Sequence, residues 1–327
     1  MAVITRRHLI ALSAAAAFAP SLFPRALRAD AWPNRTVHLI VPIAAGGPTD
    51  AVARILAEQL TKIWGQQVVV ENRSGAGTNL GNELVARADP DGYTVLYGTA
   101  SLAVNASLYR SLGYDPVGDF APVSLVSDFP LFMFVPNSSP STSVGQFVAR
   151  AQANPSKLVM GSPGAGSAPH LAEVLFMQMA KIQMTHVPYR GAAPAFTDLI
   201  PGRIDCYFGS GELLQYWRSG QVRALATTGA TRAAVAPELP TIAEAGVAGY
   251  QATSWQGLFV PAKTPRDIVD KMSADTKAAL ADPTLIDKLA RAGYPAQASS
   301  PKELGNLLRS DVVKWGAIIK AADIKVD

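Results

Sequence analysis

The stretch Val37-His-Leu-Ile-Val-Pro-Ile-Ala-Ala-Gly-Gly-Pro-Thr-Asp50 carries three local signals in succession. Its opening run is short and apolar, which is typical of a buried strand. Its two adjacent glycines favour a tight turn whose backbone a ligand can approach closely. Thr49 or Asp50 can then cap a helix, whose apolar spacing continues to about Ile63. This order of signals predicts a strand, a glycine loop and a helix, the opening unit of an α/β fold.

The same order recurs in the second half of the chain. Leu158–Gly161 has the pattern of a short strand, Ser162–Ser167 is a second glycine loop, and a helical pattern follows to Ala180. Elsewhere, short apolar runs alternate with helical patterns, which predicts parallel strands covered by helices on both faces. The offset between the two units, about 120 residues, is too long for a solenoid repeat and predicts two similar α/β lobes.

Two extended stretches without helical spacing, within residues 123–135 and 254–260, are expected to connect the lobes. We therefore expect one lobe to comprise residues 32–128 and 254–327, and the other to comprise residues 129–253. A chain of 327 residues suits two domains, because domains of roughly 150 residues are common. The C-terminal part has three helical patterns that begin at or near a proline, and we expect these helices to pack on the first lobe.

Residues 1–31 predict an export signal. Arg6 and Arg7 precede the alanine-rich apolar run Leu9–Phe23, and Ala29-Asp-Ala31 supplies a small-residue cleavage motif. The apolar run is short for a membrane-spanning helix, so a secretory signal fits better than an anchor. The paired arginines resemble a twin-arginine signal, and a Sec-type signal with two adjacent arginines is the alternative. In either case we expect the mature protein to leave the cytoplasm.

Composition argues against several classes of function. The net charge is +4, but residues 1–31 hold four basic residues and one acidic residue, so the remaining 25 basic and 24 acidic residues leave only +1. Such a mature chain lacks the basic footprint of a nucleic-acid-binding protein. The single cysteine excludes an internal disulfide and a cysteine-based zinc site, and the four histidines form no metal-binding pair. We expect no metal, cofactor or nucleic-acid partner.

Both glycine loops are candidate anion sites because each precedes a helix. The N-terminus of a helix offers unpaired N–H groups and a partial positive charge, which favour a carboxylate or a phosphate. From the spacing alone, a plain strand-to-helix turn is an equally good interpretation. A third glycine-rich stretch, Gly75-Ala-Gly77, resembles part of a dinucleotide fingerprint, but Leu80 stands where that fingerprint requires another glycine.

Several side chains near predicted strand ends are candidate ligand contacts with structural alternatives. Arg190 follows a predicted strand, and its planar guanidinium can bind two carboxylate oxygens. Arg73 can act similarly, or it can pair with Glu71. Asp205 can bind an amine or a hydroxyl, although a surface or capping role fits as well. A lone histidine such as His170 is more often structural than catalytic.

A hydrolase is the competing class of function. It would use Ser167 or Ser210 as the nucleophile and His170 as the base. However, neither serine lies in the GxSxG elbow that exposes a nucleophile in such enzymes. We therefore expect that the protein is not an enzyme.

An ordered set of motifs resembles the Bug family of substrate-binding receptors, which is associated with tripartite tricarboxylate transporters. The motifs are Val41-Pro42 with Gly46-Gly47-x-x-Asp50, Glu71-Asn72-Arg73-x-Gly75-Ala76-Gly77, Asp89-Pro-Asp-Gly-Tyr93, Ser162-Pro-Gly-x-Gly-Ser167-x-x-His170-Leu171-Ala172, His186-Val-Pro-Tyr-Arg-Gly191, Pro240-Thr241-x-x-Glu244-Ala245-Gly246 and Trp255-x-Gly257. Each motif alone is weak, but together they follow the family order along the mature chain. The sequence departs from the family where Ile43 replaces a common aromatic residue and Ser74 replaces a frequent proline.

The resemblance implies an α/β, two-lobed periplasmic-binding-protein (Venus-flytrap, type II-like) fold with a ligand cleft between the lobes. It implies a periplasmic, monomeric receptor that gives a small organic carboxylate to the membrane permease of a tripartite tricarboxylate transporter. A ligand-sensing partner of a signalling protein is the alternative. The expected ligand-binding residues are Gly46, Gly47, Thr49, Asp50, Arg73, Ala76, Ser101, Ser162, Gly164, Gly166, Ser167, His170, Arg190, Gly191 and Asp205.

Overall fold

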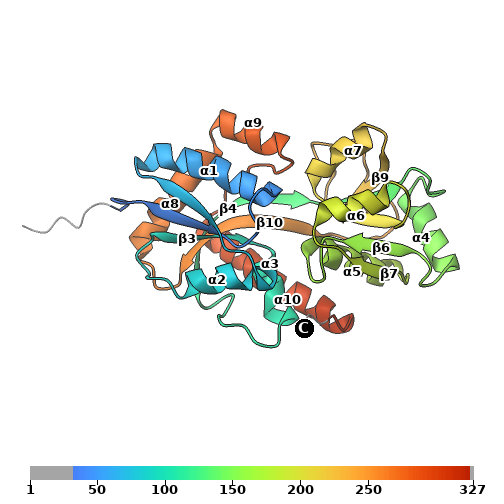
Figure 1. Cartoon of the computed structure of the whole chain (residues 1–327), viewed down its shortest axis with the longest axis horizontal. Coiled ribbons are helices and arrows are strands. Elements are labelled where there is room, and N and C mark those ends of the chain that lie inside the picture. Colours follow the sequence, from blue (N-terminus) through green and yellow to red (C-terminus); the bar gives the residue numbers. More distant parts are fainter. Residues whose placement is uncertain (1–31, 325–327) are drawn as a thin grey trace, which may run out of the picture.

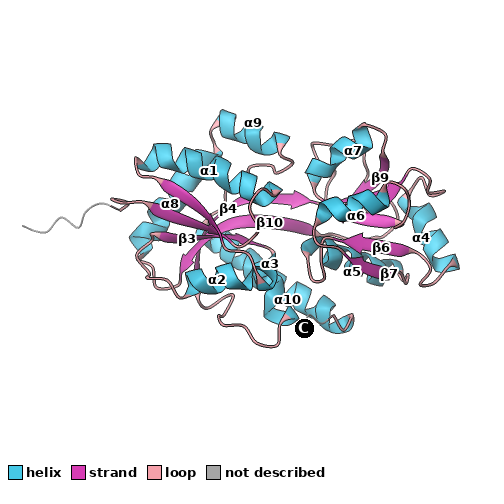
Figure 2. Cartoon of the chain, viewed as in Figure 1, coloured by secondary structure: helices cyan, strands magenta, loops and turns pink. Residues whose placement is uncertain are grey.

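Two five-stranded sheets, each covered by helices, form the computed structural model, which describes residues 32–324 (Figure 1). The predicted export signal in residues 1–31 lies outside the described residues. The strand order is β2-β1-β3-β10-β4 in the first sheet and β7-β6-β8-β5-β9 in the second. Each sheet is flanked by helices on both faces (Figure 2), so the predicted α/β class is confirmed.

The first sheet contains both the beginning of the described chain and a strand from much later in the sequence. Its strands are β1 (Val37–Val41), β2 (Val68–Asn72), β3 (Thr94–Thr99), β4 (Phe120–Pro130) and β10 (Thr253–Pro261). Its helices are α1 (Pro48–Trp64), α2 (Asn79–Ala86), α3 (Ser101–Leu108), α8 (Arg266–Leu280), α9 (Pro283–Arg291) and α10 (Pro301–Ala321), with the short 3-10 turn η2 (Ala76–Thr78) before α2. The three C-terminal helices, which begin at or beside a proline, belong to this group, where they were expected to pack.

The second sheet is built from the middle of the chain. Its strands are β5 (Phe132–Pro136), β6 (Val159–Ser162), β7 (Thr185–Pro188), β8 (Cys206–Gly209) and β9 (Val222–Thr227). Its helices are α4 (Val144–Ala153), α5 (Ala168–Ala180), α6 (Ala192–Leu199) and α7 (Leu214–Arg218), with the 3-10 turn η3 (Gly211–Leu213) before α7.

The sheets are mixed, so the prediction of parallel sheets is only partly correct. β1 is parallel to β2 and β3, and β6 is parallel to β7 and β8. In contrast, β10 is antiparallel to β3 and β4, and β5 is antiparallel to β8 and β9. The chain reaches β5 and β10 from the other sheet. It therefore enters each sheet at the end where the parallel strands finish, so β5 and β10 run in the opposite direction to those strands.

Two extended segments connect the sheets. The expected extended run at 123–135 is observed as β4 and β5, which are separated only by Leu131, and the expected run at 254–260 lies within β10. Trp255, on β10, is fully buried, and its indole Nε1 donates a 2.7 Å hydrogen bond to Asp311 on α10. This bond joins a connecting strand to the longest helix of the first group.

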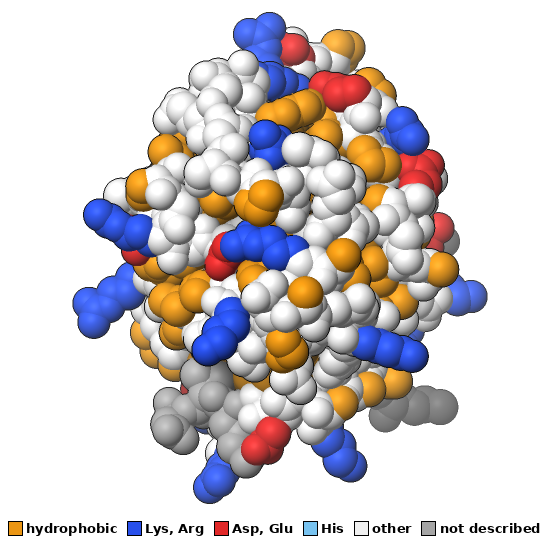
Figure 3. All heavy atoms as spheres, turned by 90° about the vertical axis from the view of Figure 1, so that its right-hand side faces the viewer, with side chains coloured by type: hydrophobic (Ala, Val, Ile, Leu, Met, Phe, Trp, Pro, Cys, Tyr) orange, Lys and Arg blue, Asp and Glu red, His pale blue; other side chains and the backbone are white. Residues whose placement is uncertain are grey.

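The surface at the α4 and α7 end has dispersed charge. Lys and Arg side chains stand singly among neutral and apolar atoms, with a few Asp and Glu side chains, so this face has no continuous patch of one sign (Figure 3). Within residues 32–324, no helix combines the length and the apolarity that crossing a membrane requires.

Candidate ligand-binding site

A cavity of about 270 Å³ lies where elements of the two sheets face each other. Its polar lining residues are Thr49, Thr99, Ser101, Ser167, Ser210, Ser254 and Gln256. Its apolar wall includes Ile43, Phe129, Leu131, Pro163, Pro169, Trp255 and Tyr294. None of the described residues that line the cavity has a formally charged side chain, so any ionic ligand here must be held by neutral dipoles. Ligands of α/β sheets commonly bind at this position, outside the carboxyl ends of the parallel strands.

The first glycine loop, at Gly46 and Gly47, is held in place by the buried carboxyl group of Asp50. Asp50 is 4% exposed, and its carboxylate accepts hydrogen bonds from Gly46 N (3.0 Å), Arg54 Nε (3.0 Å) and Asn72 Nδ2 (2.9 Å). Burial by itself raises the pKa of this carboxyl, but the bonds from Arg54, Gly46 and Asn72 outweigh burial and hold the pKa below its usual value. Gly46 has a φ of 85°, which favours glycine. Asp50 therefore shapes the loop rather than lining the cavity.

Thr49 is oriented toward the cavity by a chain of hydrogen bonds. The hydroxyl of Tyr97 donates to Gln256 Oε1 at 2.6 Å, and Gln256 Nε2 donates to Thr49 Oγ1 at 3.2 Å. Tyr97 is fully buried, and burial raises the pKa of its phenol well above the usual value, so it stays a donor. Because Thr49 accepts from Gln256, its own hydroxyl hydrogen is available to a ligand.

Three helix starts meet at the cavity. Thr49 stands in the first turn of α1, Ser101 begins α3, and Ala168 begins α5, and all three residues line the cavity. Unpaired N–H groups and the positive ends of the helix dipoles favour an anion at such a position. The geometry therefore brings together neutral hydroxyl donors and helix N-termini, which suits a carboxylate.

The second glycine loop uses its own side chains to hold its shape. Ser167 caps α5, accepting from His170 N at 3.4 Å and donating from Oγ to Gly164 O at 2.7 Å. Gly166 N donates to His170 Nδ1 at 3.0 Å. Gly164 and Gly166 have φ values of 148° and 73°, which favour glycine. Ser167 lines the cavity, whereas His170 is buried beneath the loop.

A stacked histidine pair lies under this loop. The rings of His170 and His186 are 3.8 Å apart and nearly parallel, and His186 Nε2 is 2.7 Å from Ser162 Oγ. Burial lowers the pKa of His170 to about 3, with a smaller contribution from His186, and burial lowers the pKa of His186 to about 4. Both rings are therefore neutral near pH 7. No ligand contact was predicted for His186 from the sequence.

This pair predicts acid sensitivity. An exposed histidine titrates near pH 6.5, so below that pH the unfolded chain binds more protons than the folded chain. Stability is thus fully present above about pH 6.5 and should fall toward about pH 4, by at most about 1.4 kcal/mol per pH unit for each histidine. Chemical denaturation at several pH values should show that the free energy of unfolding falls less steeply with decreasing pH in His186→Gln than in the wild type. An equal decline in the variant and the wild type would contradict this assignment.

The remaining predicted residues lie outside the cavity lining. Arg73 forms an ion pair with Glu71 at 2.6 Å, which was the alternative to a ligand contact in the sequence-based prediction. Ala76 is exposed in η2, and Arg190 is exposed without an ion-pair partner among the described residues. Gly191 N donates to Pro163 O at 3.2 Å and so braces the second loop.

Asp205 is placed away from the site. Its carboxylate pairs with Arg150 at 2.9 Å and accepts from Val159 N at 2.9 Å. Both contacts lie where β6 and β8 begin, whereas the cavity lies where these strands finish. Asp205 therefore holds two strand starts together and contacts no cavity residue.

The serine–histidine contacts do not support nucleophilic catalysis. The Ser167 hydroxyl donates to Gly164 O, and the Nδ1 atom of His170 is occupied by Gly166 N. Ser162 does contact His186, but Ser162 is fully buried. A nucleophile must reach its substrate and its base together, and no serine described here does both. Within residues 32–324, no cluster of His, Cys, Asp or Glu side chains is suited to a metal ion.

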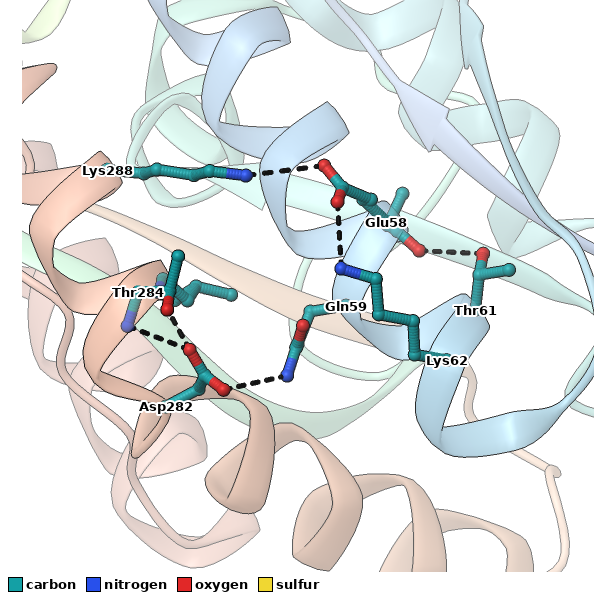
Figure 4. A network of polar contacts seen from close by, with 9 residues as sticks. Glu58, Gln59, Thr61, Lys62, Asp282, Thr284 and Lys288 are labelled. Carbon is teal, nitrogen blue, oxygen red and sulfur yellow. Dashed lines mark hydrogen bonds and ion pairs between the residues drawn. The ribbon is translucent and has the colours of Figure 1, made fainter.

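A second hollow, of about 230 Å³, lies between α1 and α9 and has a different character. Figure 4 shows that its charged side chains pair with one another or with polar neighbours. Glu58 binds Lys62 at 2.8 Å and Lys288 at 3.5 Å, while Gln59 Nε2 donates to Asp282 at 3.3 Å. These groups join two helices at an exposed surface, so we assign the ligand to the cavity between the sheets.

The model of the tripartite tricarboxylate transporter family receptor matches residues 52–324. The chain belongs to this receptor family. A relative from Pseudomonas sp. (strain P51), the UPF0065 protein in the tcbD–tcbE intergenic region, is 38% identical over 98% of this chain and 95% of its own. BugT of Bordetella pertussis is 31% identical over 91% of this chain and 92% of its own.

Solved structures of similar proteins have the same fold. The structure of R. palustris Rpa4515 with adipate is 36% identical, covers 90% of this chain and 100% of its own, and has a TM-score of 0.81. MatC from Rhodopseudomonas palustris with bound malate is 31% identical, covers 88% of this chain and 100% of its own, and has a TM-score of 0.78. This member of the tripartite tricarboxylate transporter receptor family is therefore a two-lobed solute-binding receptor and not an enzyme.

Proposed function

We propose that this receptor works in the periplasm, where it captures a small organic carboxylate and delivers it to the membrane permease of a tripartite tricarboxylate transporter. The observation that carries the proposal is the cavity, where neutral hydroxyls and three helix N-termini converge without a charged side chain. The adipate and malate held by its relatives support a carboxylate ligand. Export through residues 1–31 is part of this proposal.

One ligand carboxylate would rest between the two glycine loops. Backbone N–H groups near Gly47 and Gly166 and the hydroxyls of Thr49, Ser101 and Ser167 would donate to its oxygens. Each hydrogen bond to a charged group contributes about 1.5–3 kcal/mol. Micromolar binding needs about 8 kcal/mol beyond the entropy lost on association, so several such bonds and the apolar contacts would have to act together. The apolar wall would contact the carbon skeleton of the ligand.

Binding would stabilise a closed arrangement of two lobes. We assign residues 32–128 and 254–327 to one lobe and residues 129–253 to the other, with the β4–β5 connection and the start of β10 running between them. A ligand that contacts both lobes binds the closed state better than the open state and shifts the population toward it. The permease would then recognise the closed form.

A thermal-shift screen of the exported chain tests this proposal. A ligand at about 100 times its dissociation constant should add roughly 2.7 kcal/mol to the free energy of unfolding. Adipate, malate, aromatic acids and amino acids are suitable probes. If no carboxylate in this set raises the melting temperature, the carboxylate proposal is wrong.

Hydroxyl deletion then tests the site. Ser101→Ala should weaken the affinity for a carboxylate found in the screen by about tenfold, because a hydrogen bond to a charged group contributes about 1.5 kcal/mol or more. Ser310→Ala, at an exposed position on α10, is the matched control and should bind like the wild type. Isothermal titration calorimetry measures both, and unchanged affinity in Ser101→Ala would remove Ser101 from the site.

A further inference from the structure

Two turns from opposite sheets touch at one wall of the cavity. Ser210 and η3 follow β8 of the second sheet, while Gly293 and Tyr294 follow α9 beside the first. A Cβ atom on Gly293 would lie 2.6 Å from Glu212 N, and the φ of Gly293 is 87°. The two backbones are therefore in direct contact, at a place where glycine is required.

The side chains of these turns form a polar chain that ends at the cavity. Ser210 and Tyr294 line the cavity, and the phenol of Tyr294 interacts with both Ser210 and Glu212. The ring of Phe129 packs against Tyr294 with 4.6 Å between ring centroids. Glu212 lies behind Tyr294, and its Oε2 atom is buried without a hydrogen-bond partner. A buried oxygen without a partner costs more free energy in a charged carboxylate than as the carbonyl oxygen of a neutral carboxyl, so this burial favours the protonated form of Glu212.

We propose that Glu212, acting through Tyr294, determines whether Ser210 offers the ligand a hydrogen-bond donor or an acceptor. With Glu212 protonated, its carboxyl donates to the oxygen of Tyr294, Tyr294 donates to Ser210, and the hydroxyl hydrogen of Ser210 points to the ligand. With Glu212 ionised, every bond reverses, because the carboxylate accepts from Tyr294 and Tyr294 accepts from Ser210. Ser210 then presents only lone pairs. Glu212 is thus a positioning residue, and its role rests on the function proposed above.

The two states select different ligands. A donor at Ser210 suits a second carboxylate, whereas an acceptor there repels a carboxylate and suits a hydroxyl or an ammonium group. The receptor should therefore prefer dicarboxylates when Glu212 is protonated and lose part of that preference when it ionises.

The surroundings of Glu212 place this change near neutral pH. Burial raises the pKa of Glu212 to about 7, against the weaker opposing effects of its own backbone N–H and of Tyr294. The titratable groups that face it are Tyr294 and Tyr207, and burial raises the pKa of both phenols, so neither ionises in this range. No lysine, arginine or histidine among the described residues contributes to the pKa of Glu212. Its protonated fraction therefore falls as the pH rises through neutrality.

Calorimetric titration with adipate and with malate tests this inference. From about pH 6 to about pH 8 the affinity of the wild type for a dicarboxylate should fall about tenfold, because a carboxyl with a pKa near 7 changes its protonated fraction by roughly that factor. Free dicarboxylates are ionised throughout this range, so their own titration contributes little. In Glu212→Gln the side chain cannot ionise, and the affinity should vary less than about twofold.

Matched variants isolate the effect of Glu212. Glu238→Gln, at an exposed position, should keep the wild-type pH dependence, and Tyr294→Phe should abolish it because the chain to Ser210 is broken. If Glu212→Gln does not fold, Tyr294→Phe carries the test. Dicarboxylate binding with the same pH dependence in the wild type and in the variant would overturn the role of Glu212 and leave the proposed function intact. Failure of both probes and all other carboxylates to bind at any pH would contradict the proposed function itself.

Discussion

Replacing Gly166 with alanine is expected to lower both stability and ligand affinity, by two separable causes. The φ of Gly166 is 73°, and a left-handed conformation costs an alanine about 1–2 kcal/mol in any folded state. In addition, the new Cβ atom would lie 2.1 Å from Leu108 Cδ2. Leu108 ends α3 of the first group, so this overlap penalises the contact between the two halves. Overpacking costs typically about 1–3 kcal/mol, and we expect an affinity loss of about tenfold or more.

A double variant separates the two causes. Leu108→Ala removes the side chain that the new Cβ atom meets, so Gly166→Ala combined with Leu108→Ala should bind better than Gly166→Ala alone. Its melting temperature should stay low, because the backbone strain at Gly166 persists. Gly145→Ala, on α4, is the matched control, since a Cβ atom there meets nothing within 4 Å. If Gly166→Ala binds a carboxylate as tightly as the wild type, the close approach of the second loop to α3 is not part of the bound state.

Replacing Asp50 with alanine is expected to have the largest effect at the first loop. The change removes three hydrogen bonds and leaves Gly46 N, Asn72 and Arg54 without this acceptor. A lost bond that involves a charged group is worth about 1.5–3 kcal/mol, and we expect the free energy of unfolding to drop by about 3 kcal/mol. Ligand affinity should fall too, because the loop that carries Thr49 loses its support.

The pH dependence distinguishes Asp50 from a residue that merely packs. Its pKa is held below the usual value, so its stabilisation is present above about pH 4 and is lost as the pH falls further, through the folded-state pKa. Denaturation experiments should show that Asp50→Asn removes part of this acid sensitivity. Asp270→Ala, at an exposed helix position, is the control and should resemble the wild type. A melting temperature unchanged in Asp50→Ala would refute the structural role of this carboxylate.

The sequence predicted the local units well because their signals are local. The strand, glycine loop and helix at Val37–Asp50 and at Leu158–Ala180 depend on apolar spacing, glycine and capping residues within a few positions. Thr49, Ser101 and Ser167 were predicted near the ligand, and the structure places all three in the cavity lining.

Contacts between distant segments of the chain could not be predicted from the sequence in the same way. Tyr97 and Gln256 are 159 positions apart, and no local pattern links them. The direction of β10 and β5 was likewise hidden, because a strand that comes from the other sheet has the same apolar pattern as one that follows a helix. Tyr294 lies on a turn outside the family motifs. His186 opens one of those motifs, but it lies on an edge strand and was not predicted to contact a ligand.

For Asp205, by contrast, the sequence did contain information against a ligand contact. It precedes β8, so it stands at the start of a strand, whereas ligands of parallel sheets bind beyond the strand ends. Arg190 and Gly191 follow β7 and satisfy that rule, yet only Gly191 is tied to a cavity residue. The direction of a strand therefore shows, from the sequence alone, which candidate ligand contacts lie at the wrong end of the sheet. Which of the remaining candidates reach the ligand depends on tertiary packing.

The most direct test of the central claim is a calorimetric comparison of a dicarboxylate with its neutral diamide. The chain from residue 32 onward, unfolded and refolded to remove any retained ligand, would be titrated with adipate and with adipamide, which have the same carbon skeleton. If helix N-termini and hydroxyl donors hold an anion, adipate or a similar carboxylate should bind with a stoichiometry of about one, and its diamide should bind at least about 100-fold more weakly. Equal affinity for the acid and the amide, or no binding of any carboxylate, would contradict the account.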